Sequence, residues 1–309
     1  MLLQVVREFN VGGIVTNSTP ITANKFIEQQ LDECVGQLEA TLHSDVLSFT
    51  GEIVYGVDDL IRNVIEEKRR QSKREKLTVI LTTSGGYIEV VQRIVDTLRY
   101  HYKVVEFIVP NYAYSAGTVL VMSGDAIHMD YYSRLGPIDP QVESTSGQIV
   151  PALGYLIQWE RLIQKAGAGT ITVPEVELMV VGFDQAELYK YEQARELSIS
   201  LLKEWLANYK FKNWKRTETR GIRVTKKIRE RRAEEIAEEL NNTDRWHVHG
   251  YGISMEVLKR DLNLLIDDFG QDVNLSDQIK RYYSLLDDYM TKIDDDIVIH
   301  VVGSYVRYV

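Results

Sequence analysis

The chain has 309 residues, of which 44% are hydrophobic and 26% charged, and its formal net charge at pH 7 is −9. This is an ordinary globular composition, and the acidic balance argues against a general nucleic-acid-binding protein. The single cysteine, Cys34, excludes an internal disulfide and fits a reducing compartment. No signal-peptide pattern opens the sequence, and no uncharged apolar run approaches the roughly 20 residues of a membrane-spanning helix. We therefore expect a cytoplasmic protein without membrane association.

The first half of the chain alternates short β-branched runs with amphipathic stretches, which is typical of βαβ units around a parallel sheet. Apolar residues at helical spacing separate the first three runs, and the turn after the third run opens another helix. The sequence therefore predicts an α/β fold. The predicted strands are VLSFTG (46–51), LTVILTT (77–83), VVEFIVP (104–110) and AIHMDYYS (126–133).

From about residue 155 the pattern changes to long helical segments, of which 188–209 is the clearest. The segment 255–292 is again predicted to be helical, and 296–309 to close the chain as one strand. We predict one α/β domain with additions at both ends. Its parts are an N-terminal arm of helical or extended residues (1–44), the main domain (45–265) and a C-terminal extension of a helix and a strand (266–309).

A basic segment, 210–232, interrupts the acidic chain and continues into the acidic stretch AEEIAEEL. Such a segment is either a solvated helix face or a docking site for a partner protein or nucleic acid. Trp205, Trp214 and Trp246 flank it and suit packing beneath such a face.

Two glycine-containing turns, TTSGGY (82–87) and YSAGT (114–118), each follow a predicted buried strand and each open a helix. In a parallel sheet such turns meet at the carboxyl ends of the strands, where ligands bind. Adjacent glycines allow a sharp turn and leave N–H groups facing the crevice, as a tetrahedral oxyanion requires. Ser115 is therefore a candidate nucleophile, although a small residue packed against the sheet would give the same pattern.

The order strand, SGG, helix, strand, YSAG, helix, strand and SRLGPIDPQ resembles the Clp-class serine peptidases, in particular the serine dehydrogenase proteinase family. That family is related to ClpP, to the signal-peptide peptidases of the SppA type and to the crotonases. The resemblance covers about 45–265 and includes HGYGIS at 249–254. It implies a ClpP/crotonase-like sheet with flanking helices, a peptide or protein substrate and a homo-oligomer.

The resemblance also assigns roles to residues of the two turns. It implies that Ser115 is the nucleophile and that the backbone N–H groups of Gly86 and Ala116 form the oxyanion hole, with Gly85 and Gly117 in support.

The general base is the role that the sequence leaves open. SRLGPIDPQ lacks the histidine that ClpP uses in this region, and Asp139 there is interpreted as a turn residue. The signal-peptide-peptidase relatives use a lysine, so Lys190 is our first candidate, followed by His249 and then Lys165. A lysine can act as a base only where burial lowers its pKa toward about 7–8, and Tyr189 and Tyr191 beside Lys190 would supply such burial.

Three other functions remain compatible with these residues. They are a non-catalytic Clp-like scaffold, an α/β-hydrolase esterase with Ser115 on a nucleophile elbow, and a crotonase-type acyl-CoA enzyme. His247 and His249 invite a zinc site, but no Cys or carboxylate cluster accompanies them. His128 alternates within a strand and is expected to be a sheet residue. We expect neither a metal nor a cofactor.

Overall fold

A seven-stranded sheet forms the centre of the computed structural model, which describes residues 22–138, 141–143, 149–217, 221–246 and 252–308. The strand order is β10-β5-β3-β2-β1-β11-β12. The five strands from β10 to β1 pair in parallel, and β11 and β12 add an antiparallel edge. The bounds are β1 Asp45–Thr50, β2 Lys76–Thr82, β3 Val104–Ile108, β5 Ala126–Met129, β10 Asp267–Asp268, β11 Val298–Val301 and β12 Ser304–Arg307.

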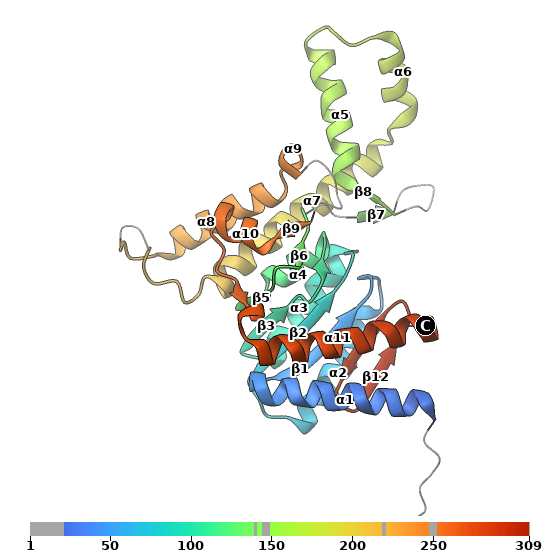
Figure 1. Cartoon of the computed structure of the whole chain (residues 1–309). Coiled ribbons are helices and arrows are strands. Elements are labelled where there is room, and N and C mark those ends of the chain that lie inside the picture. The colour runs from blue at the N-terminus through green and yellow to red at the C-terminus, as the bar shows by residue number, and fades with distance from the viewer. Residues whose placement is uncertain (1–21, 139–140, 144–148, 218–220, 247–251, 309) are drawn as a thin grey trace, which may run out of the picture.

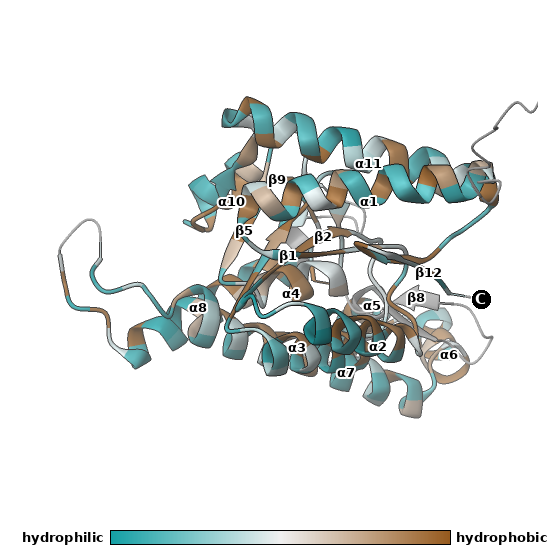
Figure 2. Ribbon diagram, turned by 90° about the horizontal axis from the view of Figure 1, so that it is seen from below, coloured by the Kyte–Doolittle hydropathy of each residue, from teal (hydrophilic) through white to brown (hydrophobic). Residues whose placement is uncertain are grey.

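Helices cover both faces of this sheet, which gives three layers (Figure 2). On one face, α1 (Ala23–Leu42) and α11 (Val273–Ile293) pack side by side and bury a core with β1, β2 and β3. On the other face, α2 (Val57–Gln71), α3 (Ile88–His101) and α4 (Ala116–Met122) bury a larger core. Both cores form because the strands carry apolar side chains on both faces, as expected for a buried parallel sheet. The predicted α/β fold class is confirmed.

An arm projects from this body (Figure 1). It consists of α5 (Ala152–Gly167), α6 (Val173–Gly182) and the first turns of α7 (Gln185–Trp205). At the base of α6, Thr172 and Glu175 cap the helix reciprocally, which fixes where it begins. A π-helical turn, η1 (Leu206–Lys210), then ends α7 against the body.

The remaining elements are short, apart from α8 (Lys226–Leu240), which packs on α7 and carries basic residues first and acidic residues last. The others are β4 Tyr112–Ala113, β6 Arg134–Leu135, β7 Gln141–Glu143, β8 Ile149–Pro151, α9 Thr243–Trp246, β9 Ile253–Ser254, α10 Met255–Asp261 and the 3₁₀ turn η2 Phe269–Gln271.

Two predicted elements differ in the structure. The closing strand is a hairpin, β11–β12, because Gly303 adopts φ +82° and reverses the chain after Val301. The predicted helix over 255–292 is divided into α10 and α11, and β10 between them pairs with β5 as the edge of the sheet.

The residues on either side of the predicted domain boundaries share one architecture. β11 pairs with β1, and α1 packs on α11, so the segments 22–44 and 266–308 complete the same sheet and its cover. The boundaries themselves stay a prediction. No described helix combines the length and the apolar character needed to cross a bilayer.

Candidate active site

Ser115 lies at the start of α4, where the chain leaves β4 and turns into the helix. Its backbone adopts φ 53° and ψ −120°, a conformation that a non-glycine residue holds only when its surroundings enforce it. The residue has no exposed surface in the single chain. Strain of this kind at one buried polar residue is characteristic of functional sites.

The turn after β2 brings both of its glycines to this point. A Cβ atom on Gly85 would lie 2.8 Å from Ser115 Cβ and 2.9 Å from the carbonyl oxygen of Tyr114, so only glycine fits there. Gly85 and Gly86 also have φ values of +111° and +144°, which glycine adopts without a steric penalty.

A short parallel bridge between Ile53 and Gly86 sets the direction of the Gly86 backbone. Ile53 N–H donates to the Gly85 oxygen at 2.8 Å, and Tyr87 N–H donates to the Ile53 oxygen at 2.9 Å. In a parallel pair, the residue between those two bonds points its own N–H and C=O to the opposite edge. The Gly86 N–H therefore points away from Ile53, and no described residue accepts its hydrogen bond.

Ala116 is the first residue of α4, so its N–H has no carbonyl within the helix. Within the described part of the chain, Gly117 N–H donates to Tyr114 and Thr118 N–H donates to Ser115, while that of Ala116 is not used. The predicted donors, Gly86 and Ala116, thus both have backbone N–H groups that other described groups do not occupy.

Two threonines, which no sequence pattern singled out, hold the two turns together. Thr83 Oγ1 accepts the Gly85 N–H at 3.1 Å, and a Cβ on Gly117 would meet Thr83 Cγ2 at 2.3 Å. Thr118 Oγ1 donates to the carbonyl oxygens of Ala113 and Gly136 and accepts the Gly136 N–H. These bonds attach the turn after β6 to the start of α4.

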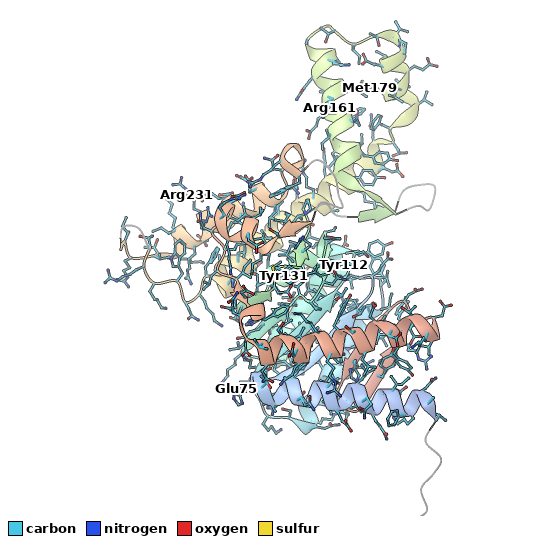
Figure 3. The ribbon with its side chains drawn as sticks, viewed as in Figure 1. Glu75, Tyr112, Tyr131, Arg161, Met179 and Arg231 are labelled. Carbon is cyan, nitrogen blue, oxygen red and sulfur yellow. The ribbon has the colours of Figure 1, made fainter. Side chains whose placement is uncertain are left out.

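Stacked tyrosine pairs flank the two turns. Tyr87, directly after Gly86, stacks on Tyr55 with ring centroids 4.5 Å apart, and Tyr114, directly before Ser115, stacks on Tyr112 at 5.0 Å. In Figure 3, Tyr112 lies in the same part of the body as Tyr131. Burial raises the pKa values of Tyr55 and Tyr114, so both phenols are neutral over the physiological pH range.

The candidate bases lie in different places. Lys190 lies on the exposed face of α7, beside Tyr189, which is 63% exposed, so the expected aromatic cover over Lys190 is not present in the single chain. Lys165 lies near the far end of α5 and pairs with Glu175 at 2.5 Å, out on the arm (Figure 1). His249, like His247 and Asp139, lies outside the described residues. The identity of the base stays a prediction.

The basic segment is not one surface. Its first residue, Lys210, ends η1 and is half-buried beside the sheet. Burial lowers the pKa of Lys210 to about 8, against the opposing effect of Asp267, Asp125 and Glu106. Most of the later basic residues are exposed, and several pair with glutamates of α8 itself.

His128 is half-buried on β5 beside Glu106, as expected for a sheet residue. Among the residues that the structure describes, no group of three or more His, Cys, Asp or Glu side chains could hold a metal ion.

Solved structures similar to this chain include two mutants of the membrane-bound stomatin-specific protease 1510-N and ClpP1 from Listeria monocytogenes. A lysine-to-alanine mutant of 1510-N, in complex with a substrate peptide, is 17% identical with a TM-score of 0.44 and covers 85% of each chain. A serine-to-alanine mutant is 16% identical with a TM-score of 0.42 and covers 74% of this chain and 82% of its own. ClpP1 is 12% identical with a TM-score of 0.40, and the match covers 78% of this chain and 97% of the ClpP1 chain.

Two curated relatives are uncharacterized proteins of Methanocaldococcus jannaschii. MJ0137 is 29% identical over 155 residues, which are 47% of this chain and 52% of the relative. MJ1495 is 26% identical over 161 residues, which are 51% of this chain and 52% of the relative. The chain thus matches about half the length of each. The sequence profile of the ClpP-like SDH-type serine proteinases matches residues 43–225, more than half of the chain, and this protein therefore belongs to that family.

Proposed function

We propose that this protein is a serine endopeptidase in which Ser115 is the nucleophile. The observation that carries the proposal is the strained backbone of Ser115, held against Gly85 with the Gly86 N–H on the open edge of the same turn. A packing serine needs neither the strain nor the two N–H groups without described acceptors. Membership of a serine proteinase family supports the same role.

In the proposed reaction, Ser115 Oγ attacks the carbonyl carbon of a peptide bond while its proton passes to a general base. The N–H groups of Gly86 and Ala116 stabilise the negative oxygen of the tetrahedral intermediate. The C–N bond then breaks, the base returns the proton to the leaving amine, and an ester on Ser115 remains. Water activated by the same base hydrolyses this ester and releases the second product.

Labelling with a fluorophosphonate tests this assignment, because the reagent phosphonylates an activated serine. We expect one adduct, on Ser115, and no adduct in Ser115→Ala. The buried hydroxyl has to become accessible first, so the time course is measured with and without a blocked peptide. A non-catalytic scaffold or a crotonase-type enzyme predicts no adduct, and an adduct on another serine also contradicts the proposal.

The base is proposed to be Lys190, with His249 as the alternative. Because Lys190 is exposed in one chain, its role requires that a neighbouring subunit or bound substrate covers it. Lys190→Ala and His249→Ala are compared in single-turnover acylation, together with Lys165→Ala, the third candidate, which pairs with Glu175 on the arm. A loss of about 100-fold or more is expected for the base alone. A loss in His249→Ala only would overturn the assignment to Lys190.

The proposed function includes a cellular location, an oligomeric state and a class of substrate. We propose a cytoplasmic homo-oligomer that acts on peptides or proteins and is not attached to a membrane. The exposed residues of the basic segment 210–232 are a candidate contact for an acidic partner protein or nucleic acid, and such binding would weaken steeply as salt increases. Ion pairs such as Lys226–Glu230 neutralise part of this charge.

A further inference from the structure

Tyr55 and Tyr87 form an aromatic wall beside the candidate oxyanion donor. The two rings stack with centroids 4.5 Å apart and an interplanar angle of 27°. Tyr87 follows Gly86 directly, and consecutive Cα atoms are about 3.8 Å apart. The pair therefore starts one residue from the backbone group that would hold the substrate carbonyl.

The outer ring of the pair is offered to solvent. Tyr55 is 58% exposed, whereas Tyr112 and Tyr114, the pair on the Ser115 side, are half-buried. Large exposed rings at a site are expected where a partner covers them, because they bury much apolar area at a small entropic cost. Of the two pairs, Tyr55–Tyr87 is thus the one with a ring available for a further stacking partner.

The position of Tyr55 is fixed from the far end of the sequence. Tyr308 Oη donates to the Tyr55 carbonyl oxygen at 2.9 Å, and the Tyr308 ring would contact a Cβ on Gly56 at 3.3 Å. Tyr308 N–H in turn donates to the Ile297 oxygen, which anchors it to the antiparallel edge of the sheet. A wall held from two sides is preorganised, and preorganised contacts contribute more to affinity than mobile ones.

We propose that Tyr55 is a specificity-determining residue that stacks on an aromatic side chain of the substrate next to the scissile bond. This inference rests on the proposed peptidase function and names its substrate class, a peptide with a Phe, Tyr or Trp residue at that position. Tyr87 forms the inner layer of the stack, and Tyr308 is a positioning residue that acts through Tyr55.

The test compares two blocked alanine-based hexapeptides that carry either phenylalanine or cyclohexylalanine. The two side chains are similar in size and apolar character, but only phenylalanine has a π system. The single substituted residue is moved along the peptide, and kcat/KM is measured for each position. At one position next to the cleaved bond we expect a preference for phenylalanine of about 3- to 10-fold, the size of a stacking contribution.

Variants at Tyr55 separate the ring from its bulk. Tyr55→Leu is expected to abolish the preference, and Tyr55→Phe to retain it. Tyr308→Phe, which removes the hydroxyl bonded to the Tyr55 carbonyl, should weaken it about 2-fold. Tyr100→Leu is the matched control, because Tyr100 is 85% exposed on α3 and belongs to neither pair. An unchanged preference in Tyr55→Leu would overturn the proposal, as would a stronger preference for arginine at the same position.

Equilibrium binding separates this proposal from the peptidase function itself. The same peptides are titrated against Ser115→Ala, which binds without cleaving. If fluorophosphonate fails to label the native protein but the binding preference depends on Tyr55, the peptidase function is wrong and the aromatic subsite stands. If Ser115 is labelled but both peptides bind equally well or not at all, the subsite is wrong and the nucleophile stands.

Discussion

The body and the arm use apolar residues in opposite ways. In α3, six apolar residues are buried against the sheet, among them Val91 and Val95. In α6, which is more apolar for its length, no residue is buried, and Val173, Val180 and Val181 are 77–82% exposed. Figure 3 shows Met179 of α6 on the arm, away from the body that holds Tyr112. Composition therefore does not decide burial, because the arm lacks a sheet to pack on.

A glycine-to-alanine substitution can be made in the body and on the arm, and the variant in the body should give the largest effect. Gly86→Ala should destabilise the protein by roughly 2–4 kcal/mol, because φ is +144° and the new Cβ would lie 2.1 Å from the Ile53 oxygen. It should also slow acylation of Ser115 by about 100-fold or more through displacement of one donor. Chemical denaturation and single-turnover labelling measure both effects.

Gly154→Ala is the control on the arm, where a Cβ meets nothing within 4 Å inside α5. It should stabilise the protein by about 0.5–1 kcal/mol through helix propensity and leave acylation unchanged. If both alanine variants lost the same free energy of unfolding, the body and the arm would not differ in how tightly these glycines are packed.

An intermediate effect is expected from two glutamates whose pKa values are both lowered to about 2. Burial alone would raise the pKa of Glu106 in the body, but hydrogen bonds with His128 and Lys76 outweigh it. On the arm, hydrogen bonds from the Lys165 ammonium and the Thr172 amide lower the pKa of Glu175. Because the folded pKa lies below the unfolded value of about 4.5, each carboxylate stabilises the fold above pH 4.5 and loses this contribution as the pH falls toward 2.

The two glutamates contribute unequally to the free energy of unfolding, because one carboxylate is mostly buried and the other is solvated. Glu106 has only 16% of its side chain exposed, so Glu106→Gln should lower the stability at pH 7 by roughly 1–3 kcal/mol and flatten the acid limb between pH 4.5 and 2. Glu175→Gln should change global stability little, since that carboxylate is solvated and pairs on the surface. Urea denaturation across this pH range checks both, and a larger loss in Glu175→Gln would contradict the assignment.

The smallest effect on stability is expected on α6. Replacing Val180 and Val181 together by serine should change the free energy of unfolding by no more than about 0.5 kcal/mol, because both side chains are exposed. Val95→Ser on α3 should cost several times more. If the arm packs on a second copy in the expected homo-oligomer, the double variant should sediment as a smaller species while Ser115 is still labelled. A large loss of stability in the monomeric double variant would show that α6 is buried after all.

The parts of the site that could be predicted from sequence are local ones. Ser115, Gly85 and Gly86 stand out because each turn follows an apolar strand and opens a helix, and parallel strands bring such turns together. The direction of the Gly86 N–H could not be predicted, because it depends on pairing with Ile53, which belongs to no regular pattern. The contact of Tyr308 with Tyr55 joins residues far apart in the chain and leaves no periodic signal.

The fold was predictable to a similar extent. Alternating strands and helices over residues 45–129 identified the parallel sheet, but β10, with two residues, is too short to produce a pattern. The basic segment was predicted as one surface, and Lys210 departs from it because the π-turn at the end of α7 directs that residue inward. Aromatic cover for Lys190 was expected from its neighbours, and helical geometry instead places Tyr189 and Lys190 on the exposed face.

The loop after β1 is completed by residues from β11–β12 and its flanks. Gly51 in this loop packs against Asp296 and Ile297, and Tyr55 is held by Tyr308. Without these residues the loop would lose its packing partners, and β1 would become an unpaired edge strand, because β11 pairs with β1 on that side of the sheet.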